Sequence, residues 1–199
     1  MKKKLILITI ILAISFSVFL PIFILTSNNV LEIIVISIGV TLYHFLMRLI
    51  VGYIINSIMK NKANYNNFWF REKRFENKLY KVLGVRKWKK YLPTYSKDTF
   101  DIKQKNIDEI LGATCQAELV HEIIMVLSLL PIGLIPFFGA PEAFIITSII
   151  AMLFDSLFVI IQRYNRPRII KIIKREQKNN KYKKKIIWYN NFNLGGLWK

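Results

Sequence analysis

The chain has 199 residues, of which 53% are hydrophobic, and it carries a formal net charge of +18. In a soluble domain apolar and charged residues are mixed along the sequence, whereas here they occupy separate segments, which argues against a soluble globular fold. The basic segments border apolar stretches, an arrangement that fits anionic lipid head groups and argues against nucleic acid as a partner.

The first apolar stretch, residues 5–25, follows Lys2, Lys3 and Lys4. It is longer than the apolar region of about 7–15 residues in a secretory signal, and no small-residue cleavage site follows it, so we predict an uncleaved membrane span. The second stretch covers residues 30–59. We expect its span to be residues 30–52, with the remainder tilted or interfacial.

The second span contains two ionisable side chains. His44 and Arg48 are four residues apart and therefore share one face of a helix. An ionisable residue at this depth must face protein or water, or extend to the interface. Two alternatives remain open: Arg48 extends to the interface beside a hydrogen-bonded His44, or this face lines the same cavity as His121.

Residues 60–106 form a basic segment that holds 14 of the 30 Lys and Arg residues. Aromatic and aliphatic side chains recur among these cations, a pattern typical of short amphipathic helices in the lipid head-group layer. The third and fourth spans are predicted at residues 121–139 and 143–163. Asp155 lies inside the last span, and we expect it to form an ion pair, with Arg48 as the candidate partner.

The distribution of cations predicts the orientation. The short connections 26–29 and 139–142 contain no Lys or Arg, so we expect them outside the cell, with both termini and residues 60–106 cytoplasmic. The predicted fold is an all-α, polytopic integral membrane protein with four transmembrane helices and interfacial amphipathic helices on the cytoplasmic side. We expect residues 1–177 to form a single membrane domain and residues 178–199 to form a basic tail that is disordered or loosely bound to the membrane.

Two polar clusters bracket the hairpin of the last two spans: AELVHE at 117–122 and QRYNRPR at 162–168. Because the hairpin returns the chain to the side it left, the two clusters should meet at one membrane face. Glu118 and His121 are spaced i, i+3, so they share a helix face and predict a general base with its orienting carboxylate. A metal site would need more ligands than the remaining candidates, His44 and Asp155, provide, so we expect none.

The second cluster, QRYNRPR, has two interpretations. It is either a cationic stop at the inner interface, or an anion pocket in which arginines bind phosphate or carboxylate through two parallel hydrogen bonds.

Together with VRKWKKYLP at 85–93, these motifs resemble the glycosyl-4,4′-diaponeurosporenoate acyltransferase family over residues 68–93 and 117–168. The namesake of the family attaches a fatty acyl group to the glucose of a carotenoid glycoside, so the resemblance implies acyl transfer in a bacterial cytoplasmic membrane. The family often has Trp-Glu where this chain has Phe75-Glu76, and His-Trp where it has His121-Glu122. The resemblance therefore implies acyl transfer more strongly than a carotenoid acceptor.

On this interpretation His121, oriented by Glu118, deprotonates a hydroxyl of a glycosylated lipid, and that oxygen attacks an activated acyl group. Arg163, Arg166 and Arg168 would hold the phosphate of the donor or of a lipid head group, and Tyr164 or Asn165 would donate to the oxyanion. The expected substrate-binding residues are Gln162, Arg163, Tyr164, Asn165, Arg166, Arg168, His44, Arg48 and Trp88.

We expect an acyl donor as co-substrate, a lipid or glycolipid acceptor, anionic membrane lipids as partners and no cofactor. The alternative is a non-catalytic membrane protein that binds anionic lipid or scaffolds lipid-pathway enzymes. Such a protein would need the arginines and aromatics but not His121.

Overall fold

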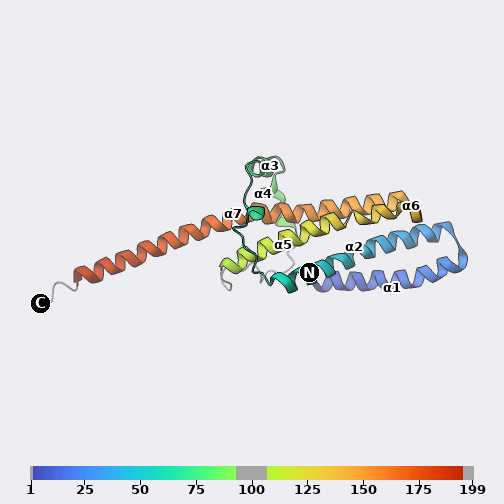
Figure 1. The fold of residues 1–199 in the computed structure, drawn as a ribbon, viewed down its shortest axis with the longest axis horizontal. Helices are drawn as coiled ribbons and strands as arrows, with labels where there is room; N and C mark the ends of the chain where they lie inside the picture. Colours follow the sequence, from blue (N-terminus) through green and yellow to red (C-terminus); the bar gives the residue numbers. More distant parts are fainter. Residues whose placement is uncertain (1, 93–106, 195–199) are drawn as a thin grey trace.

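The computed structural model describes residues 2–92 and 107–194, and every regular element in these two ranges is a helix (Figure 1). In chain order the elements are α1 (Lys2–Thr26), α2 (Asn29–Met59), η1 (Phe68–Phe70), α3 (Glu76–Val82), α4 (Val85–Trp88), η2 (Lys89–Tyr91), α5 (Ile107–Leu127), η4 (Leu130–Leu134), α6 (Ile135–Phe138) and α7 (Pro141–Leu194). Residues 93–106 of the predicted interfacial segment and 195–199 of the predicted tail lie outside the described residues.

Four helical stretches are long and apolar enough to cross a membrane: Lys3–Thr26, Asn29–Met59, Asp108–Phe138 and Pro141–Lys171. The predicted all-α architecture with four spanning helices is confirmed. The first, second and fourth stretches extend beyond the predicted spans at both ends, whereas the third begins earlier than predicted, at Asp108, and ends one residue earlier, at Phe138.

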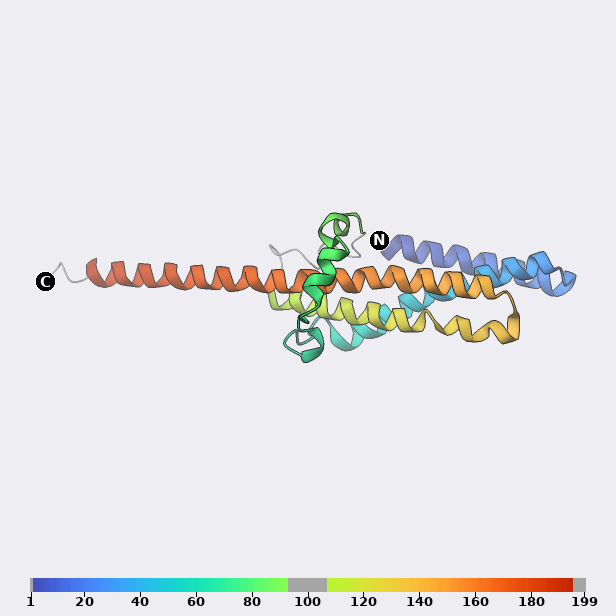
Figure 2. The same ribbon diagram turned by 90° about the horizontal axis from the view of Figure 1, so that it is seen from above.

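The spans form two hairpins whose turns lie at the same end of the molecule (Figures 1 and 2). In the first turn the Asn28 side chain caps α2 by accepting hydrogen bonds from the backbone N–H groups of Val30 and Leu31 at 2.8 and 3.4 Å. In the second, Gly139 adopts a φ of 65°, and Pro141 occupies the first helical position, where a missing N–H costs nothing.

The prolines of the third span interrupt its helix, as expected for a residue without a backbone donor. Regular α-helix ends at Leu127, and the chain continues through η4, which contains Pro131, and α6, which contains Pro136.

The distribution of polarity is the reverse of that in a soluble protein. Large aliphatic side chains of α1, such as Ile11 and Ile14, are exposed. Charged side chains are buried between the helices, namely Glu118, Asp155 and Arg166. In a membrane, lipid takes up the exposed apolar surface, and polar groups face the interior of the bundle, where they find partners.

The basic segment after α2 is held against α5 by a close approach. An added Cβ at Gly112 would lie 2.1 Å from the backbone oxygen of Asn61, so the two chains meet where a side chain would not fit. One turn further along α5, Gln116 accepts a hydrogen bond from the Asn61 N–H at 2.7 Å and donates one to Asn56 at 3.1 Å.

The small helices α3 and α4 pack against α7, at the end of the bundle away from the two turns (Figure 1). The contact is a cluster of Tyr80, Val85 and Tyr164, against which Trp88 and Ile160 also pack. The rings of Tyr80 and Tyr164 meet edge to face, with centroids 5.4 Å apart.

The tail differs from the sequence prediction of disorder. α7 continues as a helix to Leu194, so residues 178–194 extend the last span (Figures 1 and 2). The physical reason is that residues 168–194 contain no Gly or Pro and many Lys and Arg, which are favourable in helices.

The common end of the two turns yields a topology test. In a Cys115→Ala background, Ser27→Cys and Glu142→Cys should react with a membrane-impermeant thiol reagent on intact cells, because the positive-inside rule predicts that the connections without cations lie outside. Asn77→Cys, in exposed α3, should react only after the cells are opened. Labelling of Asn77→Cys on intact cells, or none at the two turn positions, would contradict the four-span topology.

Candidate functional site

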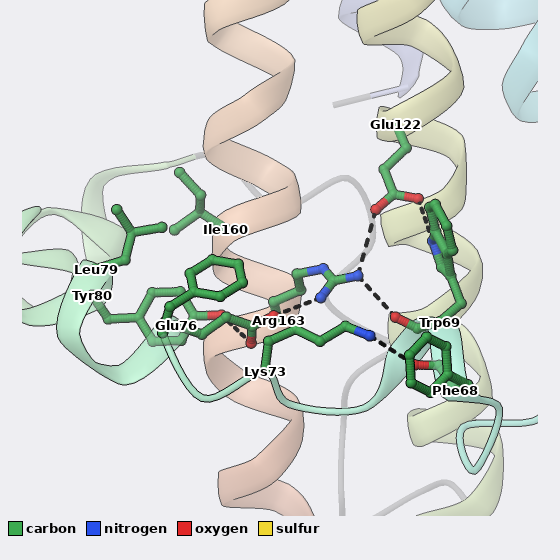
Figure 3. A pocket seen from close by; sticks show the side chains of 10 residues that line it. Phe68, Trp69, Lys73, Glu76, Leu79, Tyr80, Glu122, Ile160 and Arg163 are labelled. Atoms are coloured by element: carbon green, nitrogen blue, oxygen red, sulfur yellow. Dashed lines mark hydrogen bonds and ion pairs between the residues drawn. The ribbon is translucent and has the colours of Figure 1, made fainter.

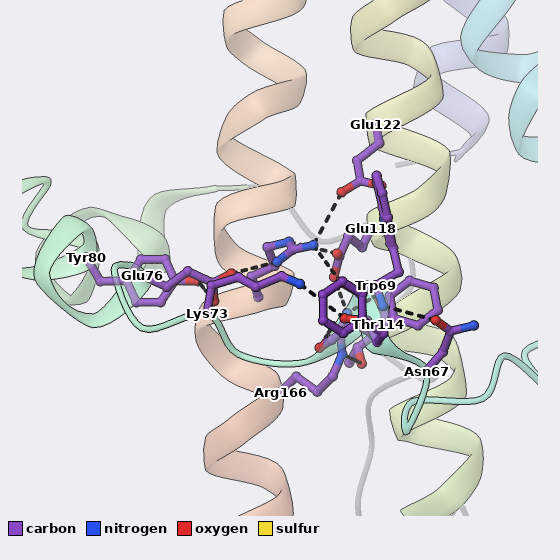
Figure 4. A network of polar contacts seen from close by, with 12 residues as sticks. Asn67, Trp69, Lys73, Glu76, Tyr80, Thr114, Glu118, Glu122 and Arg166 are labelled. Atoms are coloured by element: carbon purple, nitrogen blue, oxygen red, sulfur yellow. Dashed lines mark hydrogen bonds and ion pairs between the residues drawn. The ribbon is translucent and has the colours of Figure 1, made fainter.

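A polar network joins α5, α7 and residues 66–80 near the end of the spans (Figure 4). At its centre lies Glu118 of α5, with a side chain 0% exposed. Arg166 donates to Glu118 Oε2, and the Nε of Arg163 lies 2.8 Å from Oε1. A buried carboxylate is stable only when it is paired, so the position of Glu118 depends on both arginines.

Arg166 donates four hydrogen bonds to protein groups. Its Nε donates to Thr114 Oγ1 at 3.2 Å, and its Nη1 donates to the backbone oxygen of Phe70 at 2.9 Å. Its Nη2 donates to the backbone oxygen of Thr114 at 3.3 Å, as well as to Glu118. With 2% of its surface exposed, Arg166 has the contacts of a structural cross-link rather than those of an anion-binding group.

Arg163 connects three carboxylates. Besides its contact with Glu118, its Nη1 donates to Glu76 Oε1 at 2.6 Å, and its Nη2 lies 3.8 Å from Glu122 Oε1. Nη2 also donates to the backbone oxygen of Trp69 at 2.9 Å. The positive charge of Arg163 is thus balanced within the protein, and this side chain ties the segment before α3 to the last span.

Glu76 has a second partner in Tyr80, whose hydroxyl donates to Glu76 Oε2 at 2.9 Å. Burial raises the pKa of Tyr80, and the hydrogen bond to Glu76 and the charge of Glu76 raise it further. The phenol therefore stays neutral and serves as a donor.

A second, deeper cluster contains His121, Asp155 and Arg48. The Nδ1 of His121 lies 2.8 Å from Asp155 Oδ1. The other carboxylate oxygen accepts from Arg48 Nη2 at 2.5 Å and from Arg48 Nε at 3.1 Å. The imidazole also stacks on Phe158, with ring centroids 4.6 Å apart and planes inclined by 10°. Contacts with Asp155 and Phe158 therefore fix both the position and the plane of the ring.

The prediction that Glu118 orients His121 is wrong. The two residues share one face of α5, but Glu118 reaches Arg163 and Arg166, whereas His121 reaches Asp155. Charged partners on α7 compete successfully with the neighbour one turn away on the same helix. The predicted ion pair between Asp155 and Arg48 is confirmed.

His44 lies one turn before Arg48 on α2 and is 4% exposed. Its ring meets that of Tyr43 edge to face, with centroids 5.4 Å apart. Neither ring nitrogen has a hydrogen-bond partner among the described residues. Neither alternative for this face of α2 is found as predicted: Arg48 pairs with Asp155 inside the bundle, and His44 has no hydrogen bond among the described residues. The alternative of a cavity shared with His121 stays a prediction.

A pocket of about 370 Å³ opens beside the polar network (Figure 3). Its lining residues are Phe68, Trp69, Lys73, Phe75, Glu76, Leu79, Tyr80, Glu122, Ile160 and Arg163. Most of these walls are aromatic or aliphatic. The Trp69 indole N–H donates to Glu122 Oε2 at 2.8 Å, which places a carboxylate at the edge of the indole ring.

The other predicted binding residues of QRYNRPR lie elsewhere on α7. Tyr164 is half a turn around the helix from Asp155 and is buried under α3 and α4, so it is not placed to serve an oxyanion beside His121. Asn165 accepts a hydrogen bond from Lys89 at 2.9 Å, and Arg168 lies over the Tyr164 ring. Gln162 is half-buried and shares the face of Asp155.

Trp88 has a structural position. Its indole N–H donates to the backbone oxygen of Leu83, the residue that ends α3, at 2.9 Å. Its ring packs against the Tyr80–Val85–Tyr164 cluster. Its contacts thus hold α4 against α3 and α7.

A family model matches residues 66–175, which include the polar network, the His121–Asp155 pair and the pocket. Its description is glycosyl-4,4′-diaponeurosporenoate acyltransferase. The chain belongs to this acyltransferase family. It matches no curated protein and no solved structure.

The matched region separates the site into two parts. Every residue of the network around Glu118 lies inside the acyltransferase-family region, as do His121 and Asp155. Arg48 and His44 lie outside it, on α2. The family region therefore carries the histidine and its carboxylate, and the first hairpin adds the guanidinium that secures the carboxylate.

The sequence motifs missed three acidic partners. Asp155 was expected as an ion-pair partner of Arg48 but not as the partner of His121, and Glu76 and Glu122 were given no role. Glu76 and Glu122 belong to the two residue pairs in which this chain differs from the family pattern, Phe75-Glu76 and His121-Glu122. Among the described residues, no group of three or more His, Cys, Asp or Glu side chains could hold a metal ion.

The network yields a stability prediction. Arg166→Gln should cost about 3–5 kcal/mol, because it leaves Glu118 buried with an incomplete set of partners. The double variant Glu118→Gln/Arg166→Gln should cost less than the sum of the single changes, by about 0.5–3 kcal/mol. SDS titration in mixed micelles measures the free energy of unfolding of the two single variants and the double variant. Arg74→Gln is the matched control, since Arg74 is exposed and makes no ion pair among the described residues. Additive losses would show that the two side chains do not act as a pair.

Proposed function

We propose that this protein is a membrane-bound O-acyltransferase. It transfers a fatty acyl group to a hydroxyl of a glycosylated lipid, a carotenoid glycoside or another glycolipid, at the cytoplasmic face of a bacterial cell membrane. The observation that carries the proposal is the contact between His121 and Asp155 inside the acyltransferase-family region.

The contact suits general base catalysis. Asp155 next to Nδ1 favours the tautomer with the proton on Nδ1, which leaves the lone pair of Nε2 free to accept a proton. Arg48 holds the carboxylate in place, and Phe158 holds the plane of the ring. When the imidazole gains a proton, the adjacent carboxylate stabilises the resulting cation.

The reaction follows from these roles. Nε2 of His121 takes the proton of the acceptor hydroxyl while the hydroxyl oxygen attacks the acyl carbonyl carbon of an activated donor, a thioester or an ester. A new ester bond forms, and the bond from the acyl carbon to the leaving group breaks. The imidazolium returns its proton to the leaving group, so the histidine is regenerated.

The pocket supports a lipid-linked sugar as acceptor. Apolar side chains such as Phe75, Leu79 and Ile160 suit an apolar chain, whereas Trp69 beside Glu122 pairs an aromatic face with a carboxylate that can bind hydroxyl groups. His121 does not line this pocket: consecutive side chains on a helix point in different directions, so Glu122 faces the pocket while His121 faces Asp155. On this proposal the pocket holds the acceptor, and the reacting hydroxyl extends from it to His121.

Kinetics of variants test the base. His121→Ala should lose the roughly 10²–10⁴-fold that general base catalysis supplies. Asp155→Asn should also lose activity, because it removes the carboxylate that orients the ring and stabilises its charge. The double variant should be little worse than His121→Ala, as expected for residues that act as a unit. Rates come from purified protein in nanodiscs with radiolabelled palmitoyl-CoA and a glucosylated carotenoid acceptor.

The control is Ser156→Ala, next to Asp155 on α7, whose hydroxyl bonds only its own helix backbone, at Leu153. A fully active His121→Ala variant at normal membrane abundance would remove the catalytic role. It would leave the alternative of a non-catalytic lipid-binding or scaffolding protein. Comparing the lipids of cells with and without the protein identifies the acceptor, because the acylated product should be missing without it.

A further inference from the structure

On the other side of α7 lies a group of cations that form no ion pair with any of the described residues. Lys89 and Arg168 both lie at the ring of Tyr164: the Nζ of Lys89 is 4.8 Å from the ring centroid, and the Cζ of Arg168 is 3.4 Å from it. The Nζ of Lys89 also donates to Asn165 Oδ1 at 2.9 Å, and Arg168 donates to the backbone oxygen of Tyr164. Neutral groups thus fix two positive charges beside one ring.

The carboxylates of the polar network and of the His121 cluster pair with other cations, not with Lys89 or Arg168. The ion pairs of the described residues involve Arg48, His121, Arg163 and Arg166, and none involves Lys89, Arg168 or Arg86. The separation of these two groups of cations follows from the helix periodicity. Tyr164 and Arg168 are four residues apart and share a face of α7, and Arg163 and Arg166 lie on a different face.

Gathering these cations has an electrostatic cost. Burial is the main factor that lowers the pKa of Lys89, and the charges of Arg168 and Arg86 lower it further. Arg86 precedes Lys89 by three residues and extends the cluster along α4 and η2. A bound anion would relieve this repulsion, because an opposite charge nearby favours the charged form of each group.

We propose that Lys89 and Arg168, with Arg86 at the edge, bind a phosphate group. Phosphate suits the arrangement because an arginine fork can bind two of its oxygens while a lysine contributes a compact charge to a third. The site lies on α7 where the last span ends, beside α4, at the level expected for lipid head groups (Figure 1).

Two phosphate sources fit this place: a phosphorylated acyl donor such as an acyl-CoA, and the head group of an anionic phospholipid. The first deepens the proposed acyl transfer and rests on it, whereas the second stands without it. In either case the site keeps only Arg168 of the three arginines predicted to hold phosphate, because Arg163 and Arg166 are occupied by Glu76, Glu118 and Glu122.

Binding measurements in a His121→Ala background test the site without turnover, so they do not depend on whether His121 is the base. The full chain in phosphatidylcholine nanodiscs is titrated with palmitoyl-CoA, with empty nanodiscs subtracted. In mixed nanodiscs, native mass spectrometry counts retained phosphatidylglycerol. Lys89→Gln and Arg168→Gln should each weaken binding of at least one probe about tenfold or more, the effect of losing a charge-assisted hydrogen bond.

Lys81→Gln is the matched control, because Lys81 is an exposed cation on α3. Lys89→Arg keeps the charge and should restore most of the binding, which separates loss of the site from loss of fold. A loss confined to palmitoyl-CoA identifies the donor phosphate, and one confined to phosphatidylglycerol identifies the head group. Unchanged binding of both probes in both Gln variants, an equal loss in Lys81→Gln, or no recovery in Lys89→Arg would overturn the proposal.

Discussion

The pairing of the buried Glu118 carboxylate with two arginines determines how the rest of the site is assembled. A charge at 0% exposure must be matched by partners that do not move, and both partners come from α7. The same arginines extend to the backbone oxygens of Trp69 and Phe70 and to Glu76. The segment that forms one wall of the pocket is therefore fastened to the spans by the groups that neutralise Glu118.

This arrangement divides the charged residues of the chain by task. Arg163 and Arg166 have their charge balanced and their hydrogen bonds directed to protein groups, so they act as fasteners. His121 is only partly buried, and its single hydrogen bond among the described residues is the one to Asp155. Lys89 and Arg168 keep their charge unbalanced within the described part of the chain. One cluster, of Arg163 and Arg166 with Glu118, stabilises the structure. A second, of His121 and Asp155, is proposed to catalyse the reaction, and a third, of Lys89 and Arg168, is proposed to bind an anion.

Sequence reasoning succeeded where composition alone decides the outcome. The segregation of apolar and basic residues predicts four spanning helices, because few other arrangements can bury such stretches. The ion pair of Asp155 with Arg48 was also predictable, since charges within spans are rare and must find one another. The helical tail was not predicted, because a run of cations is typical of disordered segments. No Gly or Pro in residues 168–194 interrupts the helix, however.

The partners of Glu118 and His121 could not be derived from spacing. The i, i+3 rule states that two side chains share a face of one helix, but not which way each turns when a neighbouring helix offers a charge. That choice depends on the rotation and height of α7 against α5, which a single sequence does not encode in any local pattern. Glu76 and Glu122 were missed for the same reason, as their roles exist only once Arg163 is placed between them.

The close approach of α5 to the chain after α2 limits which residues are tolerated at Gly112. Asp155 and His121 lie on the second hairpin, whereas Arg48, which pairs with Asp155, lies on the first. At Gly112 the second hairpin meets Asn61, just after the end of the first, with no room for a side chain. A methyl group there would act as a wedge at the base of α5. A substitution that is harmless on the lipid-facing surface would at Gly112 change the spacing between Asp155 and the arginine that pairs with it.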